Sequence, residues 1–191
     1  MKLILNCLIV LLTLICTASC SKTLIKPEWT FEKAAVKIRL RADNKLNLYN
    51  NNAHTLYVCF YQLASLNTFD QMTADPSGIR QLLNCRLFDE SVAAASSKVI
   101  HAGEDLVLTL DRAERAQYVA LVAGYSDTLT NERAVRRFTC QVHHVRKNLF
   151  KKEYQCKPCP MIADVALGPT QIEYSKILPV EGLKCSDECE R

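Results

Sequence analysis

The sequence predicts an all-β protein, a β-sandwich of seven to eight short strands with one short inserted helix. Two observations support this prediction. Short segments rich in apolar, β-branched and aromatic residues recur between turn residues, and only one segment has the cap and spacing of a helix. The chain has 191 residues, 49% hydrophobic and 23% charged, which is the composition of an ordinary globular domain. Many short strands with few helices are typical of two packed sheets.

The N-terminal half of the expected domain contains two strands, a long loop and the helix. Residues 34–42 alternate apolar and basic side chains, as a strand with one buried face does. Residues 43–54 hold five Asn in twelve positions and are expected to form a loop, because Asn side chains compete for backbone hydrogen bonds. Residues 55–63 have the aromatic and β-branched composition of a central strand. Asp75 as N-cap, followed by Pro76, starts a helix over residues 75–84.

The C-terminal half supplies the remaining strands. They are expected over residues 98–104, 105–110, 117–125, 137–145, 162–167 and 171–174. Gly103 joins the first two of them. The segment 117–125 is apolar at nearly every position, which predicts a strand that is covered on both faces.

The N-terminus resembles a lipoprotein export signal. Lys2 precedes an apolar run of fourteen residues, which is shorter than the ~20 residues that span a bilayer. Ala18-Ser19-Cys20 follows and resembles a bacterial lipobox, in which the cysteine is diacylated and becomes N-terminal. The alternative is ordinary cleavage nearby, with Cys20 a disulfide cysteine. We expect a lipoprotein signal peptide at 1–19, a lipidated tether at 20–33, the β-sandwich domain at 34–178 and a Cys-containing C-terminal tail at 179–191.

Cysteine number predicts one unpaired thiol. Eight of the ten cysteines remain once residues 1–19 are removed, and lipidation of Cys20 leaves seven. An odd number requires a free thiol or an intermolecular bond. We expect Cys59 to be free, because it lies within a strongly apolar strand, where an unpaired Cys behaves as a small buried hydrophobe.

The other cysteines are expected to form structural disulfides, the usual state in an exported protein. The candidates are Cys85, Cys140, Cys156, Cys159, Cys185 and Cys189, with Cys85–Cys140 as one possible bridge. Two alternatives exist: the last four cysteines could bind zinc, or Cys156 and Cys159 could be a redox dithiol. A redox dithiol usually sits where an apolar strand enters a helix, and here a polar segment precedes the pair while Pro160 follows it.

Several functional classes are excluded by composition. The five glycines lie at least fourteen residues apart, so no glycine-rich phosphate loop is present. Without residues 1–19 the net charge is +3, too weak to predict nucleic-acid binding. His143 and His144 are adjacent in an expected strand, so their side chains point to opposite faces and do not easily share one metal. We therefore expect no enzymatic activity, no cofactor and no metal site.

Four segments between residues 88 and 125 carry a resemblance to a known family. They are Phe88-Asp89-Glu90-Ser91-Val92, Val99-Ile100-His101-Ala102-Gly103-Glu104, Leu110-Asp111-Arg112 and Tyr118-Val119-Ala120-Leu121-Val122-Ala123-Gly124-Tyr125. With the lipobox cysteine, the alternating first strand, the long loop and the helix in the same order, the chain resembles the TssJ lipoproteins of bacterial type VI secretion systems over roughly residues 16–178. The Cys-rich segments at 140–159 and 185–189 depart from the usual family member.

The resemblance implies a transthyretin-like β-sandwich and a structural role. Such a protein would be anchored by Cys20 in the outer membrane, at its periplasmic face, where it would bind the periplasmic C-terminal region of a TssM-like inner-membrane protein. The complex would also contain a TssL-like protein. Two alternatives are a lipoprotein that binds a different envelope assembly and a periplasmic thiol oxidoreductase that uses Cys156 and Cys159.

The loop over residues 43–54 is the expected partner-binding site. It is longer than the usual hairpin connection of two to five residues, and such loops tend to be functional. The family resemblance assigns the partner to this first inter-strand loop. The candidate binding residues are Asn44, Lys45, Leu46, Asn47, Leu48, Tyr49, Asn50 and Asn51, with Leu46, Leu48 and Tyr49 as anchors. In the alternative, the two leucines fold back onto the end of the sandwich and Tyr49 caps it.

Overall fold

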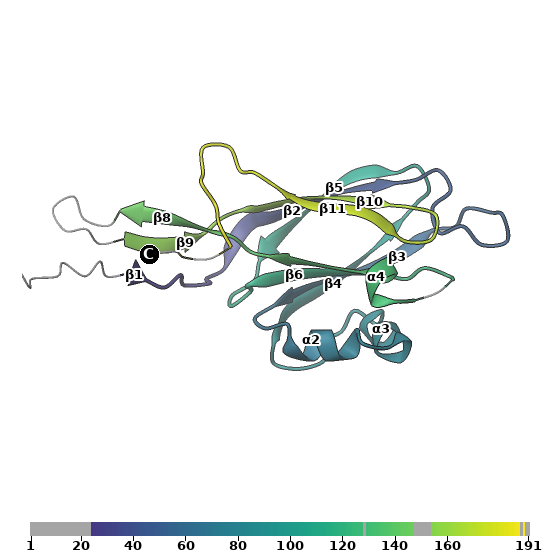
Figure 1. Cartoon of the computed structure of the whole chain (residues 1–191), viewed down its shortest axis with the longest axis horizontal. Coiled ribbons are helices and arrows are strands. Elements are labelled where there is room, and N and C mark those ends of the chain that lie inside the picture. Colours follow the sequence, from purple (N-terminus) through teal and green to yellow (C-terminus); the bar gives the residue numbers. More distant parts are fainter. Residues whose placement is uncertain (1–23, 128, 147–153, 188, 190–191) are drawn as a thin grey trace, which may run out of the picture.

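Two four-stranded sheets face each other in the computed structural model, which describes residues 24–127, 129–146, 154–187 and 189 (Figure 1). Their strand orders are β11-β10-β2-β5 and β4-β3-β6-β7. The first sheet consists of β2 (Glu32–Ala42), β5 (Asp105–Arg112), β10 (Met161–Leu167) and β11 (Ile172–Leu178). The second consists of β3 (Leu56–Leu63), β4 (Val92–Ile100), β6 (Tyr118–Ala123) and β7 (Val135–Thr139). The expected β-sandwich of seven to eight strands is therefore confirmed, with eight strands in its two sheets.

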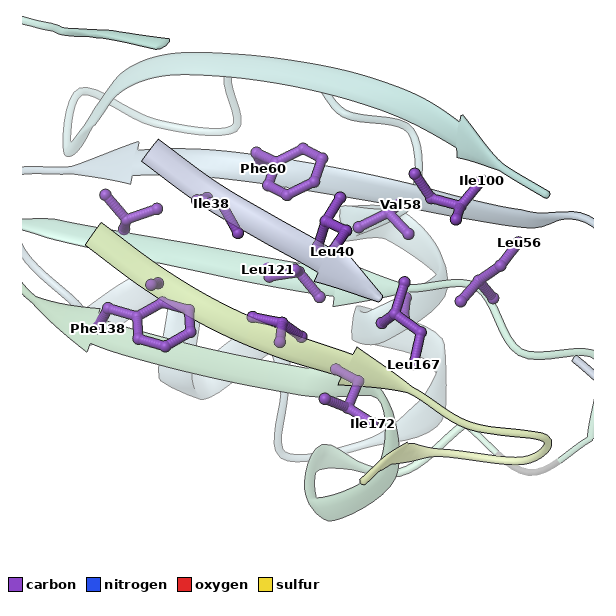
Figure 2. Close-up of a cluster of buried hydrophobic side chains, with 14 of the residues drawn as sticks. Ile38, Leu40, Leu56, Val58, Phe60, Ile100, Leu121, Phe138, Leu167 and Ile172 are labelled. Carbon is purple, nitrogen blue, oxygen red and sulfur yellow. The ribbon is translucent and has the colours of Figure 1, made fainter. Parts of the chain in front are cut away.

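The inner faces of the two sheets form the main core. In β2, the alternation seen in the sequence places Val36, Ile38 and Leu40 in this core and leaves the basic residues between them outside. Val58 and Phe60 of β3 face them from the other sheet, and Figure 2 shows how these side chains fill the space between the sheets. Within the sandwich, β2 pairs antiparallel with β5 and parallel with β10.

A second core lies on the outer face of the β3–β6 sheet. Two short helices, α2 (Asn67–Met72) and α3 (Pro76–Leu82), cover that face (Figure 1). Phe69, Ile79 and Leu82 pack there against Tyr61 of β3, whose hydroxyl donates a hydrogen bond to the Leu82 carbonyl. Strand β6 is buried on both faces, as its continuous apolar sequence predicted. The expected helix begins as predicted, because the Asp75 carboxylate accepts from the backbone N–H of residues 77 and 78.

Two helices were missed by sequence reasoning. These are α2 and the single turn α4 (Asn131–Ala134). Neither has a side-chain N-cap hydrogen bond. The N-cap of α2 is Leu66, which is not a favoured N-cap residue, and α4 begins after Thr130 but is only four residues long, too short for a helical pattern to be recognised. The expectation of one helix was wrong for this reason.

A small third sheet lies beyond one end of the sandwich (Figure 1). It contains β1 (Leu24–Ile25), β9 (Tyr154–Pro158) and β8 (Val142–Arg146), in that order. The expected strand 137–145 is in fact two strands in different sheets, because the chain leaves β7 at Thr139 and enters β8 at Val142. Strand β9, which pairs with β8, was missed by sequence reasoning. The polar sequence of β9 lacks the apolar alternation of a strand.

The third sheet also contains part of the expected tether. Residues 24–25 pair in parallel with Tyr154 and Gln155 of β9, so this part of residues 20–33 is held by backbone hydrogen bonds rather than free. Cys20 and the expected signal peptide, residues 1–19, lie outside the described residues. Among the residues that are described, no helix has the length and apolar character to cross a membrane.

Three disulfides are formed among the described residues, and one of them differs from expectation. Cys156–Cys189 and Cys159–Cys185 join the C-terminal tail to β9 and the residue that follows it, as expected for these four cysteines. Cys59 was expected to be free and is instead bonded to Cys85, so the suggested Cys85–Cys140 bridge is wrong. Cys140, which was expected to form a disulfide, is instead buried and is the one free cysteine in the part of the chain that the structure describes.

Strand alternation explains this correction. Cys59 lies on the same face of β3 as Tyr61 and Leu63, which is the face that α2 and α3 cover. Cys85 follows the end of α3 and is thereby placed above Cys59. The apolar character of the strand indicated burial correctly, but burial did not exclude a partner.

Arg112 joins the third sheet to the sandwich. Its side chain is only 3% exposed, and its Nη2 lies 2.5 Å from the Glu32 carboxylate. Its Nη1 donates to the Cys159 carbonyl at 3.3 Å, and its guanidinium lies 5.9 Å from the centre of the Trp29 ring. One buried cation therefore contacts the end of β5, the start of β2, the N-terminal segment and the disulfide region.

Candidate functional site: the loop between β2 and β3

The loop between β2 and β3, residues 43–55, projects from the end of the sandwich opposite the third sheet (Figure 1). This placement follows from topology, because β2 runs from the third-sheet end toward the loop and β3 returns. The loop and the N-terminal strand β1 therefore lie at opposite ends of the molecule.

The base of the loop is fixed by backbone hydrogen bonds to neighbouring turns. Asp43 donates its N–H to the Leu167 carbonyl and accepts from the N–H of Gly103, at 2.8 and 3.1 Å. Gly103 has a φ of +74°, and a Cβ there would lie 2.7 Å from the Asn44 Oδ1. This turn consequently needs glycine for both its backbone conformation and its close contact.

Leu46 and Asn47 belong to the interior rather than to the surface of the loop. Leu46 is fully buried in the main core, so it is not available as a surface anchor. Asn47 is 5% exposed; its Nδ2 donates to the Thr55 carbonyl at 2.9 Å and its Oδ1 accepts from the Ser126 N–H at 2.8 Å. These two residues hold the loop against β3 and the connection after β6. The alternative in which leucines fold back is thus realised for Leu46.

The tip of the loop is a miniature hairpin. Tyr49 and Asn52 exchange both backbone hydrogen bonds, at 2.9 and 3.0 Å. Between them Asn50 and Asn51 have φ of +49° and +59°, the left-handed conformation that Asn tolerates better than most residues. The Asn-rich composition that predicted a loop therefore has a specific use here: it makes a tight two-residue turn.

Tyr49 is the most prominent side chain of this tip. It is 51% exposed, and its ring lies 6.3 Å from the ring of His54 at an angle of 58°. The His54 Nε2 is 3.3 Å from the Tyr49 carbonyl oxygen, so the imidazole contacts both the ring and the backbone of Tyr49. Leu48 is half-buried, and its N–H donates to the Pro169 carbonyl at 2.7 Å.

The remaining candidate residues lie on the exposed surface of the same loop. Lys45 is exposed, and its N–H donates to the Asp43 carboxylate at 2.7 Å. The structure thus gathers Asn44, Lys45, Leu48, Tyr49, Asn50 and Asn51 on the surface and places Leu46 and Asn47 beneath it. No pattern in the sequence distinguished Leu46 from Leu48, because both are leucines flanked by polar residues. A rigid, exposed aromatic residue with a polar tip is a typical anchor for a protein partner.

Comparison with known proteins agrees with the family resemblance seen in the sequence. The family described as "Type VI secretion lipoprotein, VasD, EvfM, TssJ" matches residues 34–156. This is a family of secretion lipoproteins rather than a known family of enzymes. No curated protein sequence matches the chain.

Solved structures share the fold at low sequence identity. The T6SS lipoprotein TssJ1 from Pseudomonas aeruginosa has a TM-score of 0.56 and 19% identity, over 81% of this chain and 99% of that chain. A chain in the structure of the T6SS protein TssM C-terminal domain from EAEC has a TM-score of 0.50 and 16% identity, over 76% and 98%. Serratia marcescens Lip, a membrane-bound component of the type VI secretion system, has a TM-score of 0.50 and 14% identity, over 75% and 96%.

These likenesses support the fold, and the family match covers more than half of the chain. The matched region runs from β2 to β9 and includes the loop between β2 and β3. The chain therefore belongs to the type VI secretion lipoprotein family that includes TssJ.

Proposed function

We propose that this protein is the outer-membrane lipoprotein subunit of a type VI secretion membrane complex, and that it binds the periplasmic C-terminal region of a TssM-like protein through the loop between β2 and β3. The observation that carries this proposal is the exposed, preorganised tip around Tyr49 in a member of the TssJ family. A TssL-like protein completes the membrane complex. The role is structural.

The anchor is proposed to be the diacylated Cys20. The lipobox-like Ala18-Ser19-Cys20 motivates this assignment. The position of β1 supports it, because this strand lies at the end of the molecule opposite the loop (Figure 1). A protein anchored at this end presents the loop away from the membrane, toward a partner that rises from the inner membrane.

Preorganisation gives the loop a physical advantage in binding. Ordering a flexible loop on association costs roughly 0.5–1.5 kcal/mol for each immobilised side chain. Here the tip hairpin, the Asn47 bridge and the contact with His54 already order the backbone. Most of the contact energy of Tyr49 is then available for the partner.

The binding site is tested by Tyr49→Ala, measured by calorimetry against the periplasmic domain of the TssM-like protein from the same organism. Loss of a hot-spot tyrosine should weaken binding by about 2 kcal/mol or more, roughly thirtyfold. Phe31→Ala is the matched control, because Phe31 is 61% exposed and precedes β2 at the opposite end. Equal affinities for wild type, Tyr49→Ala and Phe31→Ala would remove the loop tip from the interface.

The anchor is tested separately by Cys20→Ser. This variant should be absent from the outer-membrane fraction, while its soluble form retains wild-type affinity for the partner domain. Mass spectrometry of the mature N-terminal peptide should find acyl chains on Cys20 of the wild type. An unmodified N-terminal peptide from membrane-extracted wild type would contradict lipid anchoring without bearing on the loop.

A further inference from the structure

Each of two adjacent histidines lies next to one disulfide in the third sheet. His143 and His144 point to opposite faces of β8, as their sequence positions predict. The His143 Nδ1 is 3.5 Å from the Cys159 Sγ, and the His144 Nδ1 is 3.9 Å from the Cys156 Sγ. The type VI secretion role proposed above uses none of these side chains.

His144 and the neighbouring disulfide, Cys156–Cys189, have the arrangement of a set of metal ligands. A ring nitrogen of His144 and the sulfur atoms of Cys156 and Cys189 all lie within 4.8 Å of one another. In a tetrahedral zinc site, bonds of about 2.0–2.3 Å place neighbouring donor atoms about 3.3–3.8 Å apart. The His144 nitrogen is already close to this spacing, since it lies 3.9 Å from the Cys156 sulfur. The two sulfur atoms are bonded to each other and must move apart to this spacing once the sulfur–sulfur bond is broken.

The surroundings keep the three donors together after that bond is broken. Cys156 and His144 face each other in the register of the β8–β9 hairpin. Cys189 stays close because two backbone hydrogen bonds between Val142 and Ser186, at 2.8 and 2.9 Å, hold the tail beside β8 without any disulfide. Cys156 is 1% exposed, whereas His144 is exposed, so an ion would sit at the edge of the hairpin with one side open to water.

We propose that reduction of the Cys156–Cys189 disulfide converts this corner into a zinc site with His144, Cys156 and Cys189 as protein ligands and water in the fourth position. Two thiolates and an imidazole are donors that Zn²⁺ prefers. In the oxidised protein the same sulfur atoms are bonded to each other and do not provide thiolates. The site therefore exists only in the reduced protein.

The chemistry balances with a dithiol as reductant. One thiolate of the dithiol attacks the Cys189 Sγ, and the electron pair of the sulfur–sulfur bond goes to Cys156, whose thiolate lies beside His144. The second thiolate of the reductant then displaces Cys189, which leaves an oxidised cyclic disulfide and two reduced cysteines. Zn²⁺ subsequently binds both sulfur atoms and displaces their two protons.

The test compares metal binding by the oxidised and the reduced protein. The soluble domain is reduced with a phosphine, freed of reductant without oxygen and titrated with Co²⁺ and then Zn²⁺. We expect a thiolate-to-Co²⁺ charge-transfer band in the reduced sample alone, its loss on Zn²⁺ addition, and about one His144-dependent ion per chain by elemental analysis. His144→Ala should weaken zinc binding at least about a hundredfold, since even the loss of a residue that only supports a ligand weakens it 10- to 100-fold.

His143→Ala is the matched control, because it removes the neighbouring imidazole that faces the other disulfide. His143→Ala should leave zinc binding at the His144, Cys156 and Cys189 site unchanged. Both histidine variants should retain the far-ultraviolet circular dichroism of the wild type. Cys189→Ser should abolish the band. Absence of the band in the reduced wild type, equal affinities for wild type and His144→Ala, or an equal loss in the two histidine variants would each overturn the proposal.

Discussion

Asn47 offers a direct test of how the loop between β2 and β3 is held. Its amide bridges the Thr55 carbonyl and the Ser126 N–H at 2.9 and 2.8 Å, and the side chain is buried. Each of these hydrogen bonds contributes about 1 kcal/mol, and Ala at a left-handed position costs roughly 1–2 kcal/mol. Asn47 has a φ of +46°. Asn47→Ala should therefore lower the free energy of unfolding by about 3–4 kcal/mol.

Asn51→Ala separates the two contributions. Asn51 has a φ of +59° and an exposed side chain, so this variant carries the backbone cost without removing the bridge. It should lose only about 1–2 kcal/mol. Asn47→Asp should fall between the two alanine variants, because a carboxylate still accepts from Ser126 but has no N–H for Thr55.

Urea denaturation followed by the fluorescence of the single tryptophan, Trp29, measures all three variants. Trp29 lies beside Arg112 near the third sheet, far from the substitutions, and so reports on global unfolding. Asn47→Ala should also weaken partner binding through a less ordered tip. Equal unfolding free energies for Asn47→Ala and Asn51→Ala, to within about 0.5 kcal/mol, would refute the bridging role of the amide.

Three further predictions concern the cores and the thiols. Replacing both Cys59 and Cys85 by Ala should lower the free energy of unfolding by about 3–4 kcal/mol in the chain-entropy model, for a sequence separation of 26; a change below 1 kcal/mol in denaturant unfolding would count against this bridge. Burial raises the pKa of Cys140 to about 12, so iodoacetamide at pH 8 should label it only after denaturation, as mass spectrometry of the two samples will show. Burial also raises the pKa of Tyr61 to about 12; because the unfolded state then loses its proton first, stability should be retained below pH ~10 and fall between pH ~10 and ~12. Tyr61→Phe should flatten this fall, and an unchanged pH profile would contradict the assignment.

The sandwich could be predicted from the sequence because its strands carry strong local signals. In β2 the alternation assigned Ile38 to the core and Arg39 to the surface, where Arg39 forms a bidentate ion pair with Asp105. In β6, continuous apolar residues indicated two covered faces, although nothing in the sequence identified α2 as part of the cover. Sequence patterns gave no such prediction where disulfides or strand pairing between distant residues determine the structure.

The third sheet shows why those parts were missed. Its strand β9 has a polar sequence and is held by disulfides to a tail about 30 residues away and by pairing with β1 at the other end of the chain. No local periodicity reports such partners. For the same reason Leu46 was indistinguishable from Leu48, since its burial depends on β-strands that are distant in sequence.

The early position of β1 fixes how far the domain stands from its proposed anchor. Only three residues separate Cys20 from Leu24, and four residue steps span at most about 14 Å. A free linker of the length expected from the sequence would let the domain wander by roughly 20 Å. Because β1 is paired with β9, a protein anchored at Cys20 as proposed would act as a spacer of constant height, and the loop tip would lie at a set distance from the bilayer. A partner that spans the periplasm would then need to extend to only one distance from the outer membrane.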